Sequence, residues 1–104
     1  MVAKAIENKI KRLYAKLKTA YPIKQILVFG SHASGRTDYK SDIDVCLVSE
    51  NFAKEDWRLR SDITQIALAI DERFDLLFTT PQKLKNDLVS PIMDQVRRKG
   101  VRIV

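Results

Sequence analysis

The stretch of residues 27–48 constrains the fold more than any other part of the chain. An apolar run ends at Gly30-Ser31, and after a short polar connection a second apolar run begins with two carboxylates, Asp42 and Asp44. Residues i and i+2 of a strand point to the same face, about 6.5–7 Å apart. If the second run is a strand, both carboxylates therefore project in the same direction from its beginning.

This pair of carboxylates predicts a metal site. Two like charges at such a separation raise each other's pKa unless a cation lies between them. Mg²⁺ is a hard cation that prefers oxygen ligands, and it is often held by one or two carboxylates together with substrate phosphates. We therefore expect Asp42 and Asp44 to bind Mg²⁺.

The Gly-Ser pair supplies a phosphate-binding signal beside the carboxylates. Gly30 has no Cβ, so a phosphate can approach its backbone closely. Ser31 adds a hydroxyl donor, and the residues after it can form a helical turn whose free N–H groups favour an anion. Each signal is weak by itself, but together in one short unit they predict a ligand that carries phosphate and metal.

These residues resemble a known signature. Gly30-Ser31, ten intervening residues and then Asp42-Ile43-Asp44-Val45 are similar to the motif of the DNA polymerase β-type nucleotidyltransferase superfamily. Within it, the chain resembles the minimal nucleotidyltransferases (MNT proteins) through Phe29-Gly30-Ser31-x-Ala33-x-Gly35 and Ser41-Asp42-Ile43-Asp44. The motif itself is short, but the chain length and the order of the expected elements also fit, so we extend the resemblance across the chain.

The resemblance implies an α/β fold in which helices flank a small mixed sheet, as in the polymerase β palm. It also implies transfer of AMP from ATP to an acceptor hydroxyl, with two Mg²⁺ ions. Asp42 and Asp44 would be metal ligands and catalytic residues, and Asp75 matches the family's third carboxylate, which lies in the third strand. Gly30 and Ser31 are the expected nucleotide contacts.

Positions close to Gly30-Ser31 also bear on the nucleotide contacts. Arg36 is a further candidate for the nucleotide phosphates, although a surface arginine is the simpler interpretation. Many members of the family have arginine where this chain has His32 or Ser34. We interpret His32 as a polar loop residue, with a phosphate contact or a base as the alternative.

The family also implies a partner. Minimal nucleotidyltransferases commonly pair with small helical HEPN-domain proteins as toxin–antitoxin modules, in which the nucleotidyltransferase is the antitoxin and adenylylates a toxin tyrosine. By resemblance we expect a co-encoded HEPN-type partner. The alternatives are an enzyme that modifies a small molecule or a nucleic-acid end, and an antitoxin that binds without catalysis; retention of all three aspartates argues against the last.

Hydrophobic periodicity predicts the other elements. We expect helices over residues 2–20 and from Trp57 onward, since apolar residues recur along one face of each. Thr80-Pro81 and Ser90-Pro91 each place a capping residue before a proline that can open a short helix. Gly100 fits a helix end. The expected strands are residues 25–29, 43–48, 74–78 and 101–104.

The connections between the strands predict how the site assembles. Thirteen residues favour an antiparallel return between the first two strands, whereas the helix before the third strand makes it parallel to the second. The end of the first strand and the starts of the other two then share one sheet edge. Asp75 interrupts an apolar strand, where a buried lone carboxylate would be costly, so a shared metal site explains it.

The composition is that of an ordinary globular chain. The 104 residues are 45% hydrophobic and 31% charged, which fits one domain over residues 1–104. The N-terminus lacks the apolar core of a signal peptide and no run could span a membrane, so we expect a cytoplasmic location. A single cysteine, Cys46, excludes a disulfide framework and is expected in the core.

Several charged and aromatic residues have simpler interpretations than catalysis. The net charge of +6 comes largely from the first helix and the C-terminus, and it is explained by solvated helix faces and helix-end cations. Direct binding of nucleic acid is therefore disfavoured. We expect Trp57 to lie in the core or at a partner contact, and Asp71 and Glu72 to be solvated.

Overall fold

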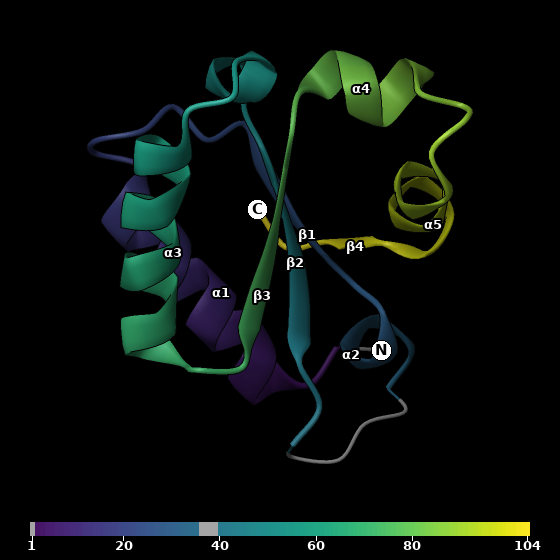
Figure 1. Ribbon diagram of the computed structural model, residues 1–104. Helices are drawn as coiled ribbons and strands as arrows, with labels where there is room; N and C mark the ends of the chain where they lie inside the picture. Colours follow the sequence, from purple (N-terminus) through teal and green to yellow (C-terminus); the bar gives the residue numbers. More distant parts are fainter. Residues whose placement is uncertain (1, 36–39) are drawn as a thin grey trace.

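The computed structural model describes residues 2–35 and 40–104. In this part of the chain, helices cover both faces of a four-stranded mixed sheet with the strand order β3-β2-β1-β4 (Figure 1). The strands are β1 (Gln25–Phe29), β2 (Ile43–Val48), β3 (Phe74–Thr79) and β4 (Val101–Arg102). The helices are α1 (Lys4–Leu17), α2 (Ser31–Ser34), η1 (Glu50–Ala53, a 3-10 helix), α3 (Trp57–Ile70), α4 (Pro81–Asn86) and α5 (Pro91–Lys99). The predicted α/β fold is confirmed.

The strand directions are those predicted from the connections. Strand β1 is antiparallel to β2 and to β4, whereas β2 and β3 are parallel. The end of β1 and the starts of β2 and β3 therefore lie at the same edge of the sheet, at the bottom of Figure 1. In the register of these strands, Phe29 pairs with Asp44, and Asp44 pairs with Asp75.

Alternation along the strands divides the core between the two faces of the sheet. Helices α1 and α3 pack on one face, against Ile26 and Val28 of β1 and the odd-numbered apolar residues of β2. Leu27, Phe29 and the buried Cys46 belong to a smaller cluster on the other face, which Val96 of α5 completes. Asp44 alternates with the residues of the first face, so it lies on the α5 side of the sheet.

The ends of two predicted elements need correction. Helix α1 runs from Lys4 to Leu17 rather than over residues 2–20, because the chain turns after Lys18 and the Tyr21 N–H bonds to the Leu17 carbonyl. Pro22 therefore only limits how far α1 could extend, and the helix ends before that limit. Strand β3 extends one residue further than predicted, to Thr79, and β4 ends two residues earlier, at Arg102.

Helices α4 and α5 begin as predicted. The Thr80 and Ser90 hydroxyls accept hydrogen bonds from the backbone N–H groups of Lys83 and Met93. Gly100 ends α5, but with an extended backbone instead of the left-handed conformation typical of a glycine stop. No helix among the described residues is long and apolar enough to span a bilayer.

The surroundings of Trp57 and Asp71 refine what was predicted. Trp57 is 75% exposed at the start of α3, which excludes the core and leaves the partner contact as its interpretation. The Asp71 side chain is only 6% exposed and is not solvated: its carboxylate accepts hydrogen bonds from Lys9 Nζ at 2.6 Å and from Arg73 Nε at 3.0 Å. This ionic cluster joins α1 to the turn between α3 and β3.

The Asp71 cluster also reaches the start of β2. The Arg73 N–H donates to the Asp71 carboxylate at 2.9 Å, and the Arg73 carbonyl accepts the N–H of Ile43 at 2.8 Å. Ile43 separates Asp42 from Asp44, and Arg73 comes two residues before Asp75. The cluster therefore fixes the turn from which the paired starts of β2 and β3 depart.

We predict that Asp71→Asn destabilises the fold in a pH-dependent manner. Hydrogen bonds from Arg73, followed by the one from Lys9, lower the pKa of Asp71 against the opposing effect of burial. The ionised carboxylate therefore stabilises the native state above the unfolded pKa of about 4, and this contribution is lost as the pH falls toward the lower folded pKa. Urea unfolding should give a loss of about 2 kcal/mol at pH 7 and a smaller loss near pH 3. The exposed neighbour Glu72→Gln is the control, and equal effects of both variants would contradict this role.

Candidate active site

The predicted carboxylates meet at the edge of the sheet where β2 and β3 begin. Asp44 and Asp75 are direct neighbours in the parallel register, and Asp42 comes just before β2. Asp44 is half-buried, whereas Asp42 and Asp75 are exposed. The exposure of Asp75 corrects one expectation: β3 is an edge strand, so this carboxylate carries no burial penalty that would by itself demand a metal.

The electrostatics of Asp44 indicate that the three carboxylates act on one another. Burial raises the pKa of Asp44 most, the charges of Asp75 and Asp42 raise it further, and His32 lowers it. A cation would relieve this repulsion, and carboxylate oxygens are the donors that Mg²⁺ prefers. The donor set therefore fits Mg²⁺, although within the described residues no three His, Cys, Asp or Glu side chains already converge as a metal-binding group.

Gly30 lies directly against this centre. Its backbone has φ 71° and ψ −149°, a region that essentially only glycine adopts. A Cβ at this position would overlap Oδ2 of Asp44. Position 30 thus requires glycine for two reasons: the backbone conformation of the turn out of β1, and the close approach of the Asp44 carboxylate.

The predicted helical turn after Gly30 is confirmed as α2, but the prediction for one of its residues, His32, is wrong. His32 is not a loop residue: it is 5% exposed, and its Nε2 donates to the Ser41 carbonyl at 3.1 Å. This hydrogen bond joins α2 to the residue before Asp42. Ser31 is half-buried at the start of α2, beside Gly30, and Arg36 lies outside the described residues.

A cleft of about 770 Å³ opens beside Gly30 and Ser31. Its other lining residues are Ala33 and Ser34 of α2 and Gln95 and Lys99 of α5. Gln95 and Lys99 are four residues apart on one exposed side of α5. Neither was predicted as a site residue, since the basic C-terminal segment gives no sign that α5 reaches Gly30.

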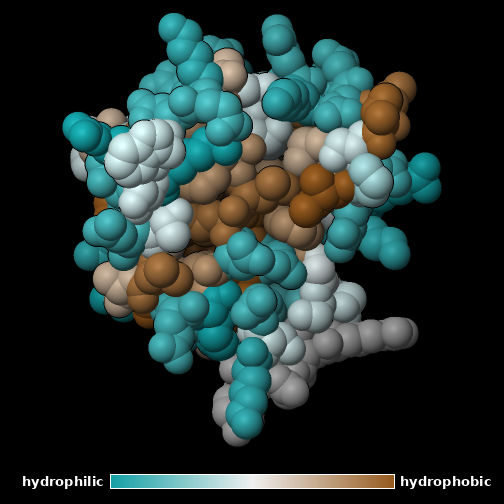
Figure 2. Space-filling view, in the orientation of Figure 1, coloured by the Kyte–Doolittle hydropathy of each residue, from teal (hydrophilic) through white to brown (hydrophobic). Residues whose placement is uncertain are grey.

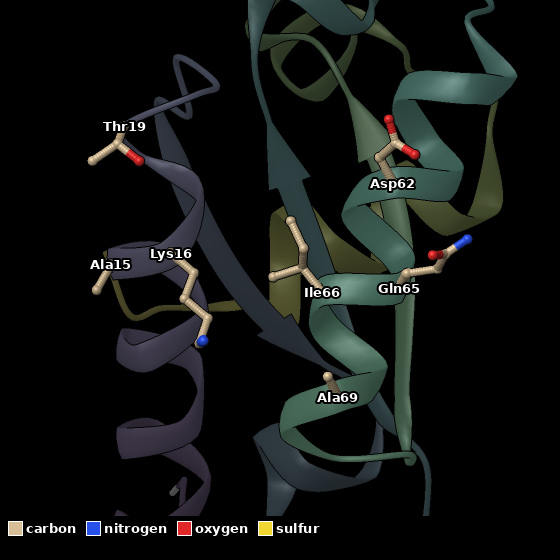
Figure 3. Close-up of a pocket in the computed structure, with 7 residues that line it drawn as sticks. All are labelled: Ala15, Lys16, Thr19, Asp62, Gln65, Ile66 and Ala69. Carbon is tan, nitrogen blue, oxygen red and sulfur yellow. The ribbon is translucent and has the colours of Figure 1, made fainter.

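A second hollow lies away from these residues, between α1 and α3 (Figure 3). It has a volume of about 600 Å³ and is lined by Ala15, Lys16 and Thr19 of α1 and by Asp62, Gln65, Ile66 and Ala69 of α3. None of the predicted catalytic or nucleotide-binding residues that the structure describes lines this hollow. The chemistry of the site therefore points to the cleft beside Gly30.

Comparison with known families agrees with this geometry. Residues 10–101 match the family model of the nucleotidyltransferase domain. The chain belongs to the nucleotidyltransferase domain family. The prediction of a nucleotidyltransferase is thereby confirmed, while no curated protein is similar enough to match the chain.

Solved structures with the same fold include toxin–antitoxin complexes. One, a toxin–antitoxin with AMP-PNP, is 26% identical to this nucleotidyltransferase, with a TM-score of 0.65 over 94% of this chain and 72% of that one. A tri-AMPylated Shewanella oneidensis HEPN toxin in complex with MNT antitoxin has 24% identity, a TM-score of 0.59, and coverage of 97% and 71%. The toxin–antitoxin MntA-HepT has 23% identity, a TM-score of 0.57, and coverage of 98% and 72%. The last two likenesses support the fold.

We predict that Gly30→Ala disables the site of this nucleotidyltransferase. The added methyl group strains the backbone by about 1–3 kcal/mol and forces Asp44 to move. Thermal unfolding should register the strain, and calorimetry with AMP-PNP and Mg²⁺ should register weaker binding. Gly35→Ala is the control, because Gly35 also has a positive φ, 76°, but lies at the other end of α2. Unchanged nucleotide affinity in Gly30→Ala would disprove the assignment.

Proposed function

We propose that this nucleotidyltransferase is an MNT-type antitoxin that transfers AMP from ATP to a hydroxyl of a partner protein, a tyrosine of a HEPN-type toxin. The observation that carries the proposal is the single sheet edge at which Asp42, Asp44 and Asp75 adjoin Gly30 and the cleft. Gly30 lines the cleft and lies against the Asp44 carboxylate, so phosphates bound at Gly30 would be close to the carboxylates.

Each residue at this edge of the sheet has its own role in the proposed transfer. Asp42, Asp44 and Asp75 would hold Mg²⁺, which when bound balances phosphate charge and lowers the pKa of the acceptor hydroxyl. Gly30 admits the triphosphate close to the backbone, and Ser31 offers it a hydroxyl donor. The acceptor oxygen attacks the α-phosphorus as the bond to pyrophosphate breaks, and the exposed Asp75 takes the hydroxyl proton.

The surface around Asp75 favours a macromolecular acceptor. Small polar substrates usually need a concave pocket that buries most of their surface. Asp75 instead lies exposed on an edge strand, followed by the half-buried Leu76, Leu77 and Phe78. Figure 2 shows apolar side chains gathered in the middle of this side of the molecule, and exposed apolar surface of this kind is typical of protein contacts.

The solved structures with this fold support the same acceptor class. Their names describe toxin–antitoxin complexes, one with AMP-PNP and one with a tri-AMPylated HEPN toxin. The ATP analogue corresponds to the donor of the proposed reaction, and the AMPylated toxin corresponds to its product. We therefore extend nucleotide and partner from those proteins to this chain.

We predict that Asp75→Asn separates catalysis from folding. The substitution preserves volume on an exposed side chain, so stability and nucleotide binding should survive, while transfer should fall by at least about 100-fold. Asp42→Asn and Asp44→Asn should lose metal-dependent binding as well. Calorimetry with ATP and Mg²⁺, with and without chelator, measures binding, and AMP incorporation measures transfer. Parental activity in Asp75→Asn, or metal-independent ATP affinity in the parent, would refute these roles.

We also predict that the protein with ATP and Mg²⁺ turns over little alone and adenylylates a co-encoded helical partner. The partner's own surface supplies the orientation that the open edge lacks. Intact-mass analysis of the partner after incubation with the parental protein should show AMP adducts, and incubation with Asp75→Asn should not. An unmodified partner together with rapid modification of an aminoglycoside or a nucleic-acid end would overturn the protein-acceptor assignment.

A further inference from the structure

We propose that Lys99, at the end of α5, binds the triphosphate of the nucleotide. The inference rests on the proposed function and adds to it a lysine side chain that binds the phosphate chain. The cleft beside Gly30 and Ser31 is lined from the opposite side by Lys99 and Gln95. In the part of the cleft's lining that the structure describes, Lys99 is the one charged residue.

The sheet register explains why Lys99 reaches the cleft. Strand β4 pairs antiparallel with β1, so that Val101 lies opposite Val28. Lys99 is the last residue of α5 and precedes Val101 by two residues, while Gly30 follows Val28 by two residues. Although β4 has only two residues, its pairing therefore keeps the end of α5 near the turn that approaches Asp44, and Lys99 and Gly30 line the same cleft.

Packing at the end of α5 holds this position. Val96 is buried in the core on the α5 side of the sheet, and its carbonyl accepts the Gly100 N–H at 2.9 Å. A Cβ on Gly100 would overlap the same carbonyl, so glycine is needed for the tight exit from α5 into β4. The backbone around Lys99 is thus anchored on both sides, while its side chain stays exposed.

Lys99 differs from the two cations before it in its interactions with the residues that the structure describes. Arg97 donates to the backbone oxygens of Leu84 at 2.6 Å and Asp87 at 2.9 Å. Arg98 Nε donates to the Asp94 carboxylate at 3.0 Å. Lys99 forms no ion pair with any residue that the structure describes.

The carboxyl groups of the site explain why a cation is useful on the other side of the cleft. Asp42, Asp44 and Asp75 lie at the start of β2 and β3, and a triphosphate brought beside carboxylates is repelled unless cations lie close to it. A lysine ammonium is a compact charge on a flexible stem, suited to phosphate oxygens. Lys99 therefore lets the protein itself attract phosphate at the side of the cleft opposite α2.

The test compares Lys99→Gln with Arg98→Gln. Both variants remove one exposed cation from the last turn of α5, so net charge and helix-dipole effects change equally. Calorimetry with AMP-PNP and Mg²⁺ should give an affinity about tenfold lower in Lys99→Gln, little change in Arg98→Gln, and recovery in Lys99→Arg. Affinity for adenosine, which has no phosphate, should be the same in all of them.

Each alternative outcome is decisive. Equal AMP-PNP affinity in the parent and Lys99→Gln overturns the inference, and so does an equal loss in Lys99→Gln and Arg98→Gln, which would indicate general electrostatics. A loss of adenosine affinity matching that of AMP-PNP would also overturn it. If the parental protein binds AMP-PNP but modifies no acceptor, the proposed function fails while the role of Lys99 stands. If the parent binds no nucleotide, both fail.

Discussion

The structure depends on the register of three strands that meet at one edge of the sheet. Backbone pairing aligns Phe29 of β1, Asp44 of β2 and Asp75 of β3 in a single row. The two carboxylates repel each other, so nothing in their own chemistry brings them together. Hydrogen bonds of the ladder and the apolar cores on both sheet faces impose the arrangement. The fold thereby maintains a concentration of negative charge that a hard cation would stabilise.

One face of the sheet contributes mainly to stability, and the other carries the candidate active site. On one face, α1 and α3 bury the larger apolar cluster, and the Asp71 cluster adds an ionic tie between α1 and the turn before β3. The other face carries the smaller cluster, and near its open end it carries the carboxylates and the cleft. Because side chains alternate along a strand, adjacent residues such as Ile43 and Asp44 serve stability and chemistry separately. Rigid packing on one face therefore positions the reactive groups on the other.

The sequence was most informative where the signal is local. Gly30, Asp42 and Asp44 lie within one short motif, and connection lengths were sufficient to predict the strand directions. Burial of His32, the pairing of Asp71 and the approach of Lys99 to Gly30 were missed, since each depends on segments far apart in the chain. The sequence places Lys9 and Asp71 on separate elements and gives no sign that they are in contact. For Trp57 the sequence left the core and a partner contact both open, because an aromatic residue at a helix start reveals nothing about its tertiary neighbours.

The order of the strands gives the proposed reaction a direction across the sheet. Edge strand β3 exposes Asp75 and its apolar neighbours, which is the side that a protein acceptor can reach. Strand β1 leads into Gly30, and the pairing of β4 with β1 brings the end of α5, with Lys99, to the same cleft. This side of the sheet is suited to a triphosphate. Asp44 of β2 lies between them. An acceptor hydroxyl entering from β3 and a pyrophosphate leaving toward α5 would thus approach the α-phosphorus from opposite sides, as in-line displacement requires.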